Sequence, residues 1–223
     1  NPRACRELEF PIKIPLEQKK VAIIGGGPAG LSAAKHCGEM GYEVTIFEAS
    51  KEIGGQFNLA KVIPGKEEFH ETIRYYKKML NKYGVKINYE SRVDVNSFPI
   101  ADFDEVIVAT GVQPRKLKLE GADSPNVLPY DQVIRGMHEV GQKVAVIGAG
   151  GIGFDMCEYL INGDQSMPTV EEFAKVWGVD ISLEQRGGLQ KPASHKAERE
   201  IYLLQRKSSK HGAGLGKTTG WIH

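Results

Sequence analysis

The sequence predicts an α/β fold made of two similar units, each built around a parallel sheet. The segment KVAIIGGGPAG, residues 20–30, recurs as KVAVIGAGGIG, residues 143–153. In both copies a β-branched, apolar run precedes the glycines, which is typical of a buried parallel strand. A stretch compatible with an amphipathic or buried helix follows each glycine turn. A strand, glycine turn and helix in this order begin a Rossmann-like unit.

The first unit is expected to contain four strands and two main helices. The strands are predicted at residues 21–24, 43–47, 85–89 and 105–109, and the helices at residues 31–40 and 66–83. Gly41 provides a stop for the first helix. Apolar residues at helical spacing, from Phe69 to Leu80, make the second helix amphipathic. Thr110 and Gly111, after the last strand, begin the segment that leads out of this unit.

The second unit repeats the pattern with a long interruption. A strand at 144–147 and a helix at 152–161 are followed by residues 162–200, rich in Gly, Pro, Gln and Ser, and then by a strand at 201–205. We interpret 162–200 as an inserted loop without an assigned role, since loops this long are unusual inside a compact domain. The expected organisation is a linker at 1–18, a first domain at 19–115 and a second domain at 116–223, both domains being incomplete on their C-terminal side.

Composition restricts the class of protein. The 29 basic and 28 acidic residues leave a net charge of +1, which gives no reason to expect nucleic acid or an anionic membrane as a partner. No apolar run has the roughly 18 residues of a membrane span. Without a recognisable signal peptide, the chain is expected to be cytoplasmic, and its start at Asn1 suggests a fragment.

The cysteines and histidines predict no redox pair and no metal site. Three cysteines without a CxxC motif argue against a thioredoxin-like pair or a zinc ribbon. Cys37 and Cys157 fall in expected helices, as buried structural thiols do. The six histidines have no metal-ligand spacing, and no catalytic side chain can be named. Residues 212–218 resemble a P-loop, but His211 stands where that motif needs glycine.

The repeated glycines are the candidate cofactor-binding residues. In a GxGxxG turn, the first glycine permits the tight bend, the second lets a pyrophosphate approach the backbone, and the third lets helix and strand pack closely. The helix N-terminus adds free N–H groups and a partial positive charge. These candidates are Gly25, Gly27 and Gly30 in the first copy and Gly148, Gly150 and Gly153 in the second.

The strand that follows each turn suggests two different cofactors. Glu48 lies 18 residues after Gly30, where a carboxylate accepts hydrogen bonds from an adenosine ribose. The second copy has Arg206 and Lys207 instead, and a guanidinium pairs with a 2′-phosphate. The first site is therefore expected to bind FAD and the second NADPH. An ordinary exposed acid and a solvated basic turn are the alternatives.

Two dinucleotide sites in one chain are typical of electron transfer between a tightly held flavin and a diffusible nicotinamide. The chain is therefore interpreted as part of an NADPH-dependent flavoprotein oxidoreductase. A non-catalytic module that senses redox state is an alternative from another class. A disulfide reductase is disfavoured because CxxC is missing.

Several stretches resemble the bacterial NADPH-dependent 2,4-dienoyl-CoA reductases, which belong with old yellow enzyme and trimethylamine dehydrogenase. The matching stretches are NPRAC at 1–5, GGQFN at 54–58, IPGKEEF at 63–69 and GLGKTTGWIH at 214–223. The resemblance implies an N-terminal (β/α)₈ barrel with FMN and the acyl-CoA site, then a [4Fe–4S] cluster, both outside this chain. Electrons would pass from NADPH to FAD, then to the cluster, then to FMN, and finally to the double bonds of a dienoyl-CoA in fatty acid β-oxidation.

The resemblance also implies contacts for individual residues. It places Ala29, Glu48, Gln56, Lys66 and Val93 at FAD-contacting positions, and Gln205 and Arg206 near NADP. We add Thr110, Gly111 and Lys207 as cofactor-binding candidates. An enoate reductase or an amine dehydrogenase of the same group is the alternative within enzymes. The fragment alone is not expected to reduce acyl-CoA.

Overall fold

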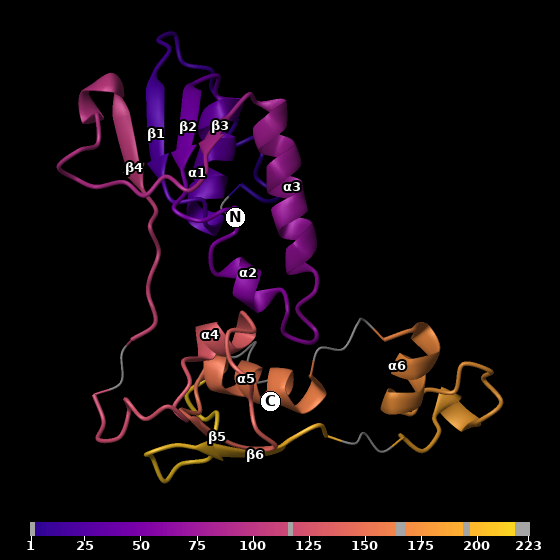
Figure 1. Ribbon diagram of the computed structural model, residues 1–223. Helices are drawn as coiled ribbons and strands as arrows, with labels where there is room; N and C mark the ends of the chain where they lie inside the picture. The colour runs from indigo at the N-terminus through magenta and orange to yellow at the C-terminus, as the bar shows by residue number, and fades with distance from the viewer. Residues whose placement is uncertain (1–2, 116–117, 164–167, 194–196, 217–223) are drawn as a thin grey trace. The chain divides into compact units, whose positions relative to one another are not determined.

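The computed structural model describes residues 3–115, 118–163, 168–193 and 197–216 (Figure 1). Two compact units are present. The first comprises residues 1–61 and 68–117, and the second comprises residues 62–67 and 118–223. Both contain parallel strands and packed helices, so the predicted α/β class is confirmed.

The first unit contains a four-stranded parallel sheet in the order β3-β2-β1-β4. Its strands are β1 (Lys20–Ile24), β2 (Glu43–Phe47), β3 (Lys86–Asn88) and β4 (Glu105–Val108). Its helices are α1 (Pro28–Glu39), α2 (Phe57–Ala60) and α3 (Phe69–Lys82), with a 3₁₀ turn η1 (Ile100–Asp102). The chain therefore passes to β2 on one side of β1 and later returns to β4 on its other side. In such sheets, ligands bind at this switch point, beyond the carboxyl ends of the strands.

The core of this unit lies between β1, β2 and the helices. Ile23 and Ile46 from the central strands pack with Leu31 of α1 and Leu80 of α3, and all four side chains are at most 1% exposed. Burying each such side chain contributes about 1.5–3 kcal/mol. The core thereby fixes the N-terminal end of α1 against the end of β1, which positions the glycine turn.

The helix predicted at 66–83 begins instead at Phe69. Residues 62–67 precede it as turns, and the side chain of Ile63 is only 3% exposed. This short segment belongs to the second unit although both its neighbours belong to the first. Hydrophobic periodicity does not predict that six residues within the first unit's sequence belong to the second unit.

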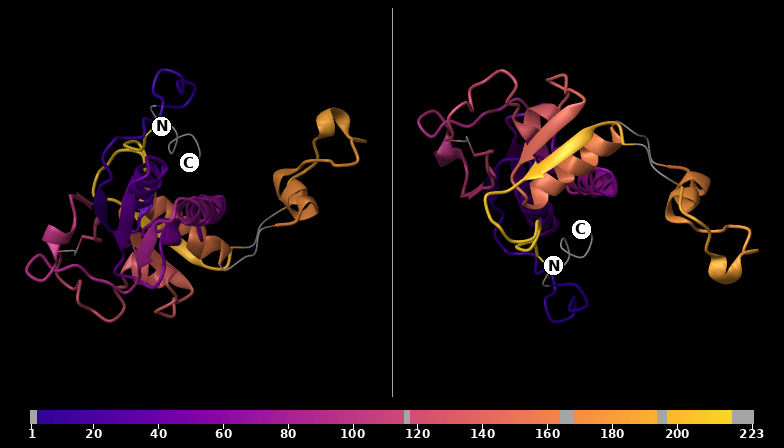
Figure 2. Two further views of the ribbon diagram at one scale, coloured as in Figure 1. Left: turned by 90° about the horizontal axis from the view of Figure 1, so that it is seen from above. Right: turned by 90° about the horizontal axis from the view of Figure 1, so that it is seen from below.

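The second unit is built around two parallel strands, β5 (Lys143–Ile147) and β6 (Glu200–Leu204). Helix α5 (Gly151–Asn162) covers one face of the pair (Figure 2). Its Met156 and Leu160 pack against Val144, Val146 and the neighbouring α4 (Tyr130–Ile134). The strand–turn–helix pattern predicted for this unit is thus present, with the last strand ending at Leu204 rather than at 205.

The prediction that residues 162–200 form only a loop is wrong. They contain the helix α6 (Val170–Trp177) and a 3₁₀ turn η2 (Arg186–Gly188). Thr169 caps α6, because its Oγ1 accepts a hydrogen bond from the Glu172 N–H while the Glu172 carboxylate accepts one from the Thr169 N–H. Such a capping box satisfies backbone donors at both positions. Gly178, with φ +68°, ends the helix in the left-handed conformation.

None of the helices in the described ranges combines the length and apolar character needed to cross a membrane.

Candidate functional site

The turn between β1 and α1 requires glycine at its first position. Gly25 has a φ of +108°, and a Cβ on it would lie 2.4 Å from the carbonyl oxygen of Ala109. Both the conformation and the contact exclude other residues. The close approach brings the end of β4, and with it Thr110 and Gly111, beside the glycine turn.

The other two glycines of this turn have opposite surroundings. A Cβ on Gly30 would lie 1.9 Å from the Gly25 carbonyl oxygen, so the helix and the turn touch through their backbones. A Cβ on Gly27 would have no neighbour nearer than 4.0 Å. Space is thus left beside Gly27 and the N–H groups of Ala29 and Gly30, which lie in the first turn of α1 where a helix provides no intrahelical acceptor. These features fit a pyrophosphate held by backbone N–H groups.

Glu48 directly follows β2, and its side chain contacts the backbone of the glycine turn. Its side chain is only 8% exposed. One carboxylate oxygen accepts a 2.6 Å hydrogen bond from the Gly26 N–H, and the other accepts bonds from the N–H and Oγ of Ser50. A carboxylate has about four acceptor positions, so one remains for a ribose hydroxyl.

A second loop borders this turn, and its Gly54 and Gly55 were not among the predicted site residues. The Gly54 N–H donates to the Gly26 carbonyl, and a Cβ on Gly55 would lie 3.0 Å from the Gly27 Cα. Both glycines have positive φ. The Gly54-Gly55 pair was the sequence signal for this close approach. The loop continues into Gln56, whose exposed amide donates to the Val112 carbonyl at 3.0 Å.

Val93 lies in the segment that follows β3. It is half-buried and follows Ser91, whose N–H donates to the carbonyl of Glu48. The structure thus brings Gly25–Gly30, Glu48, Gln56, Thr110 and Gly111 to the carboxyl edge of one sheet, and Val93 to the segment beside Glu48.

The β5–α5 turn repeats the first turn closely. Gly148 has a φ of +116°, and a Cβ on Gly153 would lie 1.8 Å from the Gly148 carbonyl oxygen. Gly150 has open space around its Cβ position. Residues Gly151 to Gly153 offer first-turn N–H groups. This turn therefore also fits a dinucleotide pyrophosphate.

Gln205, Arg206 and Lys207 directly follow β6. The Gly148 N–H donates to the Leu204 carbonyl at 2.8 Å, so these three residues begin beside the glycine turn. The side chains of Arg206 and Lys207 are exposed. The structure thus brings all six second-site candidates to the carboxyl edge of the β5–β6 pair.

Residues 19–192 match the family described as pyridine nucleotide-disulphide oxidoreductase. The chain belongs to this family. It is an FAD- and NAD(P)H-binding flavoprotein oxidoreductase domain.

Relatives of the family carry this domain within longer proteins. The chain is 33% identical over 171 residues to cinnamate reductase of Clostridium sporogenes, covering 77% of this chain and 25% of that protein. A 2-naphthoyl-CoA reductase structure superposes with a TM-score of 0.69 at 26% identity, over 92% of this chain and 36% of that one. The structure of 6-hydroxypseudooxynicotine amine oxidase from Pseudomonas geniculata superposes with a TM-score of 0.59 at 27% identity. The match covers 70% of this chain and 26% of that one. The chain spans about a quarter to a third of each.

The disulphide chemistry in the family's name has no counterpart among this chain's cysteines. Cys5, Cys37 and Cys157 are all free thiols. Burial in α1 and α5 raises the pKa of the Cys37 and Cys157 thiols, which keeps them protonated and poorly nucleophilic. Across the described ranges, no three His, Cys, Asp or Glu side chains are grouped to hold a metal ion.

Lys66, expected from the resemblance to face the FAD phosphates, is paired with a carboxylate in the structure. Its Nζ lies 2.6 Å from both carboxylate oxygens of Asp155, in the second turn of α5. Both residues belong to the second unit and are partly exposed. A contact of Lys66 with FAD stays a prediction, and it requires exchange of this ion pair.

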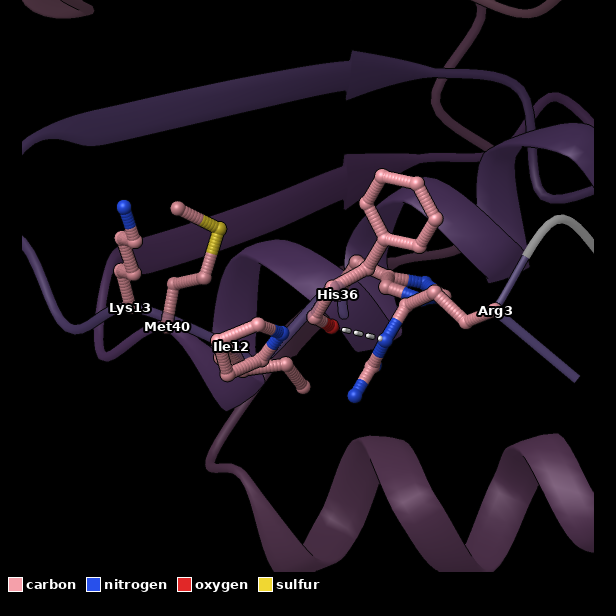
Figure 3. Close-up of a pocket in the computed structure, with 7 residues that line it drawn as sticks. Arg3, Ile12, Lys13, His36 and Met40 are labelled. Atoms are coloured by element: carbon pink, nitrogen blue, oxygen red, sulfur yellow. Dashed lines mark hydrogen bonds between the residues drawn. The ribbon is translucent and has the colours of Figure 1, made fainter. Parts of the chain in front are cut away.

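A cavity of about 490 Å³ lies where the N-terminal segment packs against α1 (Figure 3). It is lined by Arg3, Phe10, Pro11, Ile12, Lys13, His36 and Met40. The Arg3 Nε donates to the Phe10 carbonyl at 2.9 Å across one wall. His36 and Met40 lie toward the C-terminal end of α1, whereas the glycine turn is at its N-terminal end. The cavity is therefore separate from the candidate dinucleotide site.

Proposed function

We propose that the chain is the FAD- and NADPH-binding part of an NADPH-dependent 2,4-dienoyl-CoA reductase. Residues 19–115 form its FAD domain, residues 116–223 its NADP domain, and residues 1–18 the linker from a barrel. The proposal is carried by one observation. Two nearly identical glycine turns are followed by different chemistry, a buried Glu48 in one and the exposed Arg206 and Lys207 in the other.

In the proposed first site, Gly27 leaves room for the pyrophosphate, Ala29 and Gly30 donate N–H groups, and Glu48 accepts from the adenosine ribose. Gln56, Val93, Thr110 and Gly111 border the flavin. In the second site, the α5 N-terminus holds the pyrophosphate of NADPH, and Arg206 and Lys207 pair with its 2′-phosphate.

Held at the Gly148–Gly153 turn, NADPH would supply a hydride, and FAD held at the Gly25–Gly30 turn and Glu48 would supply a two-electron acceptor. The role of this chain's residues is to bind and orient these groups, since no side chain of the described sites is placed as a proton donor to a substrate carbon. An iron–sulfur cluster, FMN and the dienoyl-CoA site are proposed to lie outside this chain.

The acyl-CoA substrate is supported by two independent findings. The IPGKEEF and GLGKTTGWIH stretches resemble dienoyl-CoA reductases. One similar solved structure is that of a 2-naphthoyl-CoA reductase in complex with 2-naphthoyl-CoA, which is also an unsaturated acyl-CoA thioester. A second candidate is an enoate reductase, which the 33% identity to cinnamate reductase favours.

The test uses the full-length enzyme. Anaerobic NADPH is expected to bleach the flavin absorbance, and turnover is expected with 2,4-dienoyl-CoA. Faster turnover with cinnamate would favour the enoate reductase, and a colourless protein without turnover would favour a non-catalytic module.

The cofactor preference is tested with Arg206→Ala. This variant is expected to lower kcat/KM for NADPH about tenfold or more and to change the value for NADH little, because charge-assisted pairs to phosphate are the strong ones. Arg186→Ala, in η2, serves as a control that removes an exposed arginine elsewhere. Equal losses with both cofactors would show that Arg206 does not bind the 2′-phosphate.

A further inference from the structure

The strand registers define equivalent positions in the two units. Ile24 of β1 pairs with Phe47, and Ile147 of β5 pairs with Leu204. The first glycine of each turn then donates its N–H to the last strand residue, from Gly25 to Phe47 at 2.9 Å and from Gly148 to Leu204 at 2.8 Å. The residue after each strand therefore occupies the same place beside its turn. These two residues are Glu48 and Gln205.

The two side chains do different things at this shared position. Glu48 bends back to its own glycine turn and accepts from Gly26. The side chain of Gln205 instead bonds within the segment that follows β6, because its amide Nε2 donates to the carbonyl of Ser209. This bond closes a tight turn whose first two residues, Arg206 and Lys207, are exposed.

The far end of this basic turn is also held in place. The Ala213 N–H donates to the Lys210 carbonyl at 3.2 Å. Gly212 has a φ of +78°, and a Cβ on it would lie 3.2 Å from the ring of Phe154 in α5. The turn is thus anchored at one end by Gln205 and at the other by contact with the helix that starts at the glycine turn.

Charge is distributed to suit an extra phosphate. Between 205 and 210 there are three cationic side chains, those of Arg206, Lys207 and Lys210, and residues 205–216 include no acid. A carboxylate at the position of Gln205 would face a 2′-phosphate at short range and repel it. An amide does not repel the phosphate, and it does not form an ion pair with Arg206 that would compete with the phosphate.

We propose that Gln205 determines the cofactor specificity of the second site, as the neutral counterpart of Glu48 and as the residue that positions the Arg206–Lys207 turn. The inference rests on the proposed function of this site. It assigns Gln205 a role apart from direct contact. The neutral side chain places no negative charge beside the 2′-phosphate, and its bond to Ser209 shapes the loop that binds this phosphate.

Binding of two nucleotides that differ only in this phosphate tests the inference without any turnover. Calorimetric titration compares 2′,5′-ADP with 5′-AMP on the full chain. The wild type is expected to prefer 2′,5′-ADP. Gln205→Glu is expected to weaken 2′,5′-ADP binding about tenfold or more and to leave 5′-AMP binding unchanged or stronger. Gln205→Ala, which loses the turn bond but adds no charge, is expected to lose a smaller factor for 2′,5′-ADP only.

Gln190→Glu is the matched control, because the Gln190 amide also donates to a carbonyl, that of Val179, but outside the candidate sites. Circular dichroism checks that all variants fold alike. If Gln205→Glu binds 2′,5′-ADP as tightly as a wild type that prefers it, the inference is overturned and the proposed function stands. If the wild type binds neither nucleotide, the proposed second site fails, and the inference fails with it.

Discussion

Glu48 combines a structural contact with the chemistry expected of a ribose-binding acid. Its spacing from the glycines predicted its position at the end of a strand. That spacing does not predict that its carboxylate accepts a hydrogen bond from the Gly26 N–H within the turn itself. That contact depends on backbone geometry, which residue spacing does not specify. One side chain therefore both holds the turn in shape and offers an acceptor at its edge.

Replacing Glu48 by alanine is predicted to weaken FAD binding by about 1–3 kcal/mol, because the Gly26 and Ser50 donors lose their buried partner. Flavin affinity is measured by fluorescence titration of the apoprotein. Glu52→Ala removes an exposed acid from the same loop and is expected to leave affinity unchanged. An unaltered affinity in Glu48→Ala would refute the ribose assignment.

At Gln205 the sequence was less informative. The predicted strand ran to residue 205, whereas β6 ends at Leu204. Strand ends are uncertain by a residue or two from sequence, since alternation of side chains says little about the last residue. Only the paired registers reveal that Gln205, and not Arg206, stands where Glu48 stands.

At the scale of elements, both strand–turn–helix units were predictable because their constraints are local. A third glycine is needed wherever a helix touches the turn that precedes it. Gly30 and Gly153 meet this requirement, because a Cβ on either would lie under 2 Å from a carbonyl oxygen.

Gly153→Ala is predicted to destabilise the second unit by more than about 2 kcal/mol and to abolish its nucleotide binding, because backbone must shift to relieve the contact. Gly151→Ala is the matched control. A Cβ there meets nothing within 4 Å, and alanine favours the helix. Thermal unfolding and 2′,5′-ADP titration measure both effects. Similar behaviour of the two variants would contradict the role assigned to the third glycine.

The inserted segment was predicted less well. Its overall composition favoured a loop, but Thr169 and Glu172 form a capping box, and Val170, Phe173 and Trp177 have helical spacing. These local signals outweigh the average composition of 162–200. The start of α3 at Phe69 is a different case. The pairing of Lys66 with Asp155 joins residues 89 apart, which no local pattern predicts.

At the scale of the whole molecule, the repeated motif was visible in the sequence but its surroundings were not. On the face of β5–β6 away from α5, the side chains of Ile147, Tyr202 and Leu204 are 58%, 51% and 48% exposed. Parallel sheets usually have both faces covered. The alternation of apolar residues in β5 and β6 predicts that this face is apolar, but it does not predict which element would pack on it.

The last prediction concerns what the 223-residue chain does alone. Reducing a dienoyl-CoA needs a flavin against the acyl chain and a proton donor beside it. The two glycine turns are proposed to bind dinucleotides by their phosphates and riboses, and neither proposed site includes such a donor among the described residues. The relatives that carry this domain are about two and a half to three times as long as this chain. The isolated chain is therefore predicted to show no acyl-CoA reductase activity, while slow NADPH-dependent reduction of ferricyanide remains if FAD is bound.

The assay mixes purified chain, FAD, NADPH and a 2,4-dienoyl-CoA and follows the diene absorbance. Ferricyanide reduction in the same preparation separates the two steps, because it needs only the nicotinamide and flavin sites. Loss of the diene above a no-protein control would place the substrate chemistry within this chain, and the proposed division between dinucleotide sites here and acyl-CoA site elsewhere would be wrong. Ferricyanide reduction alone is the expected result, since transfer from NADPH to FAD would use only the two proposed dinucleotide sites.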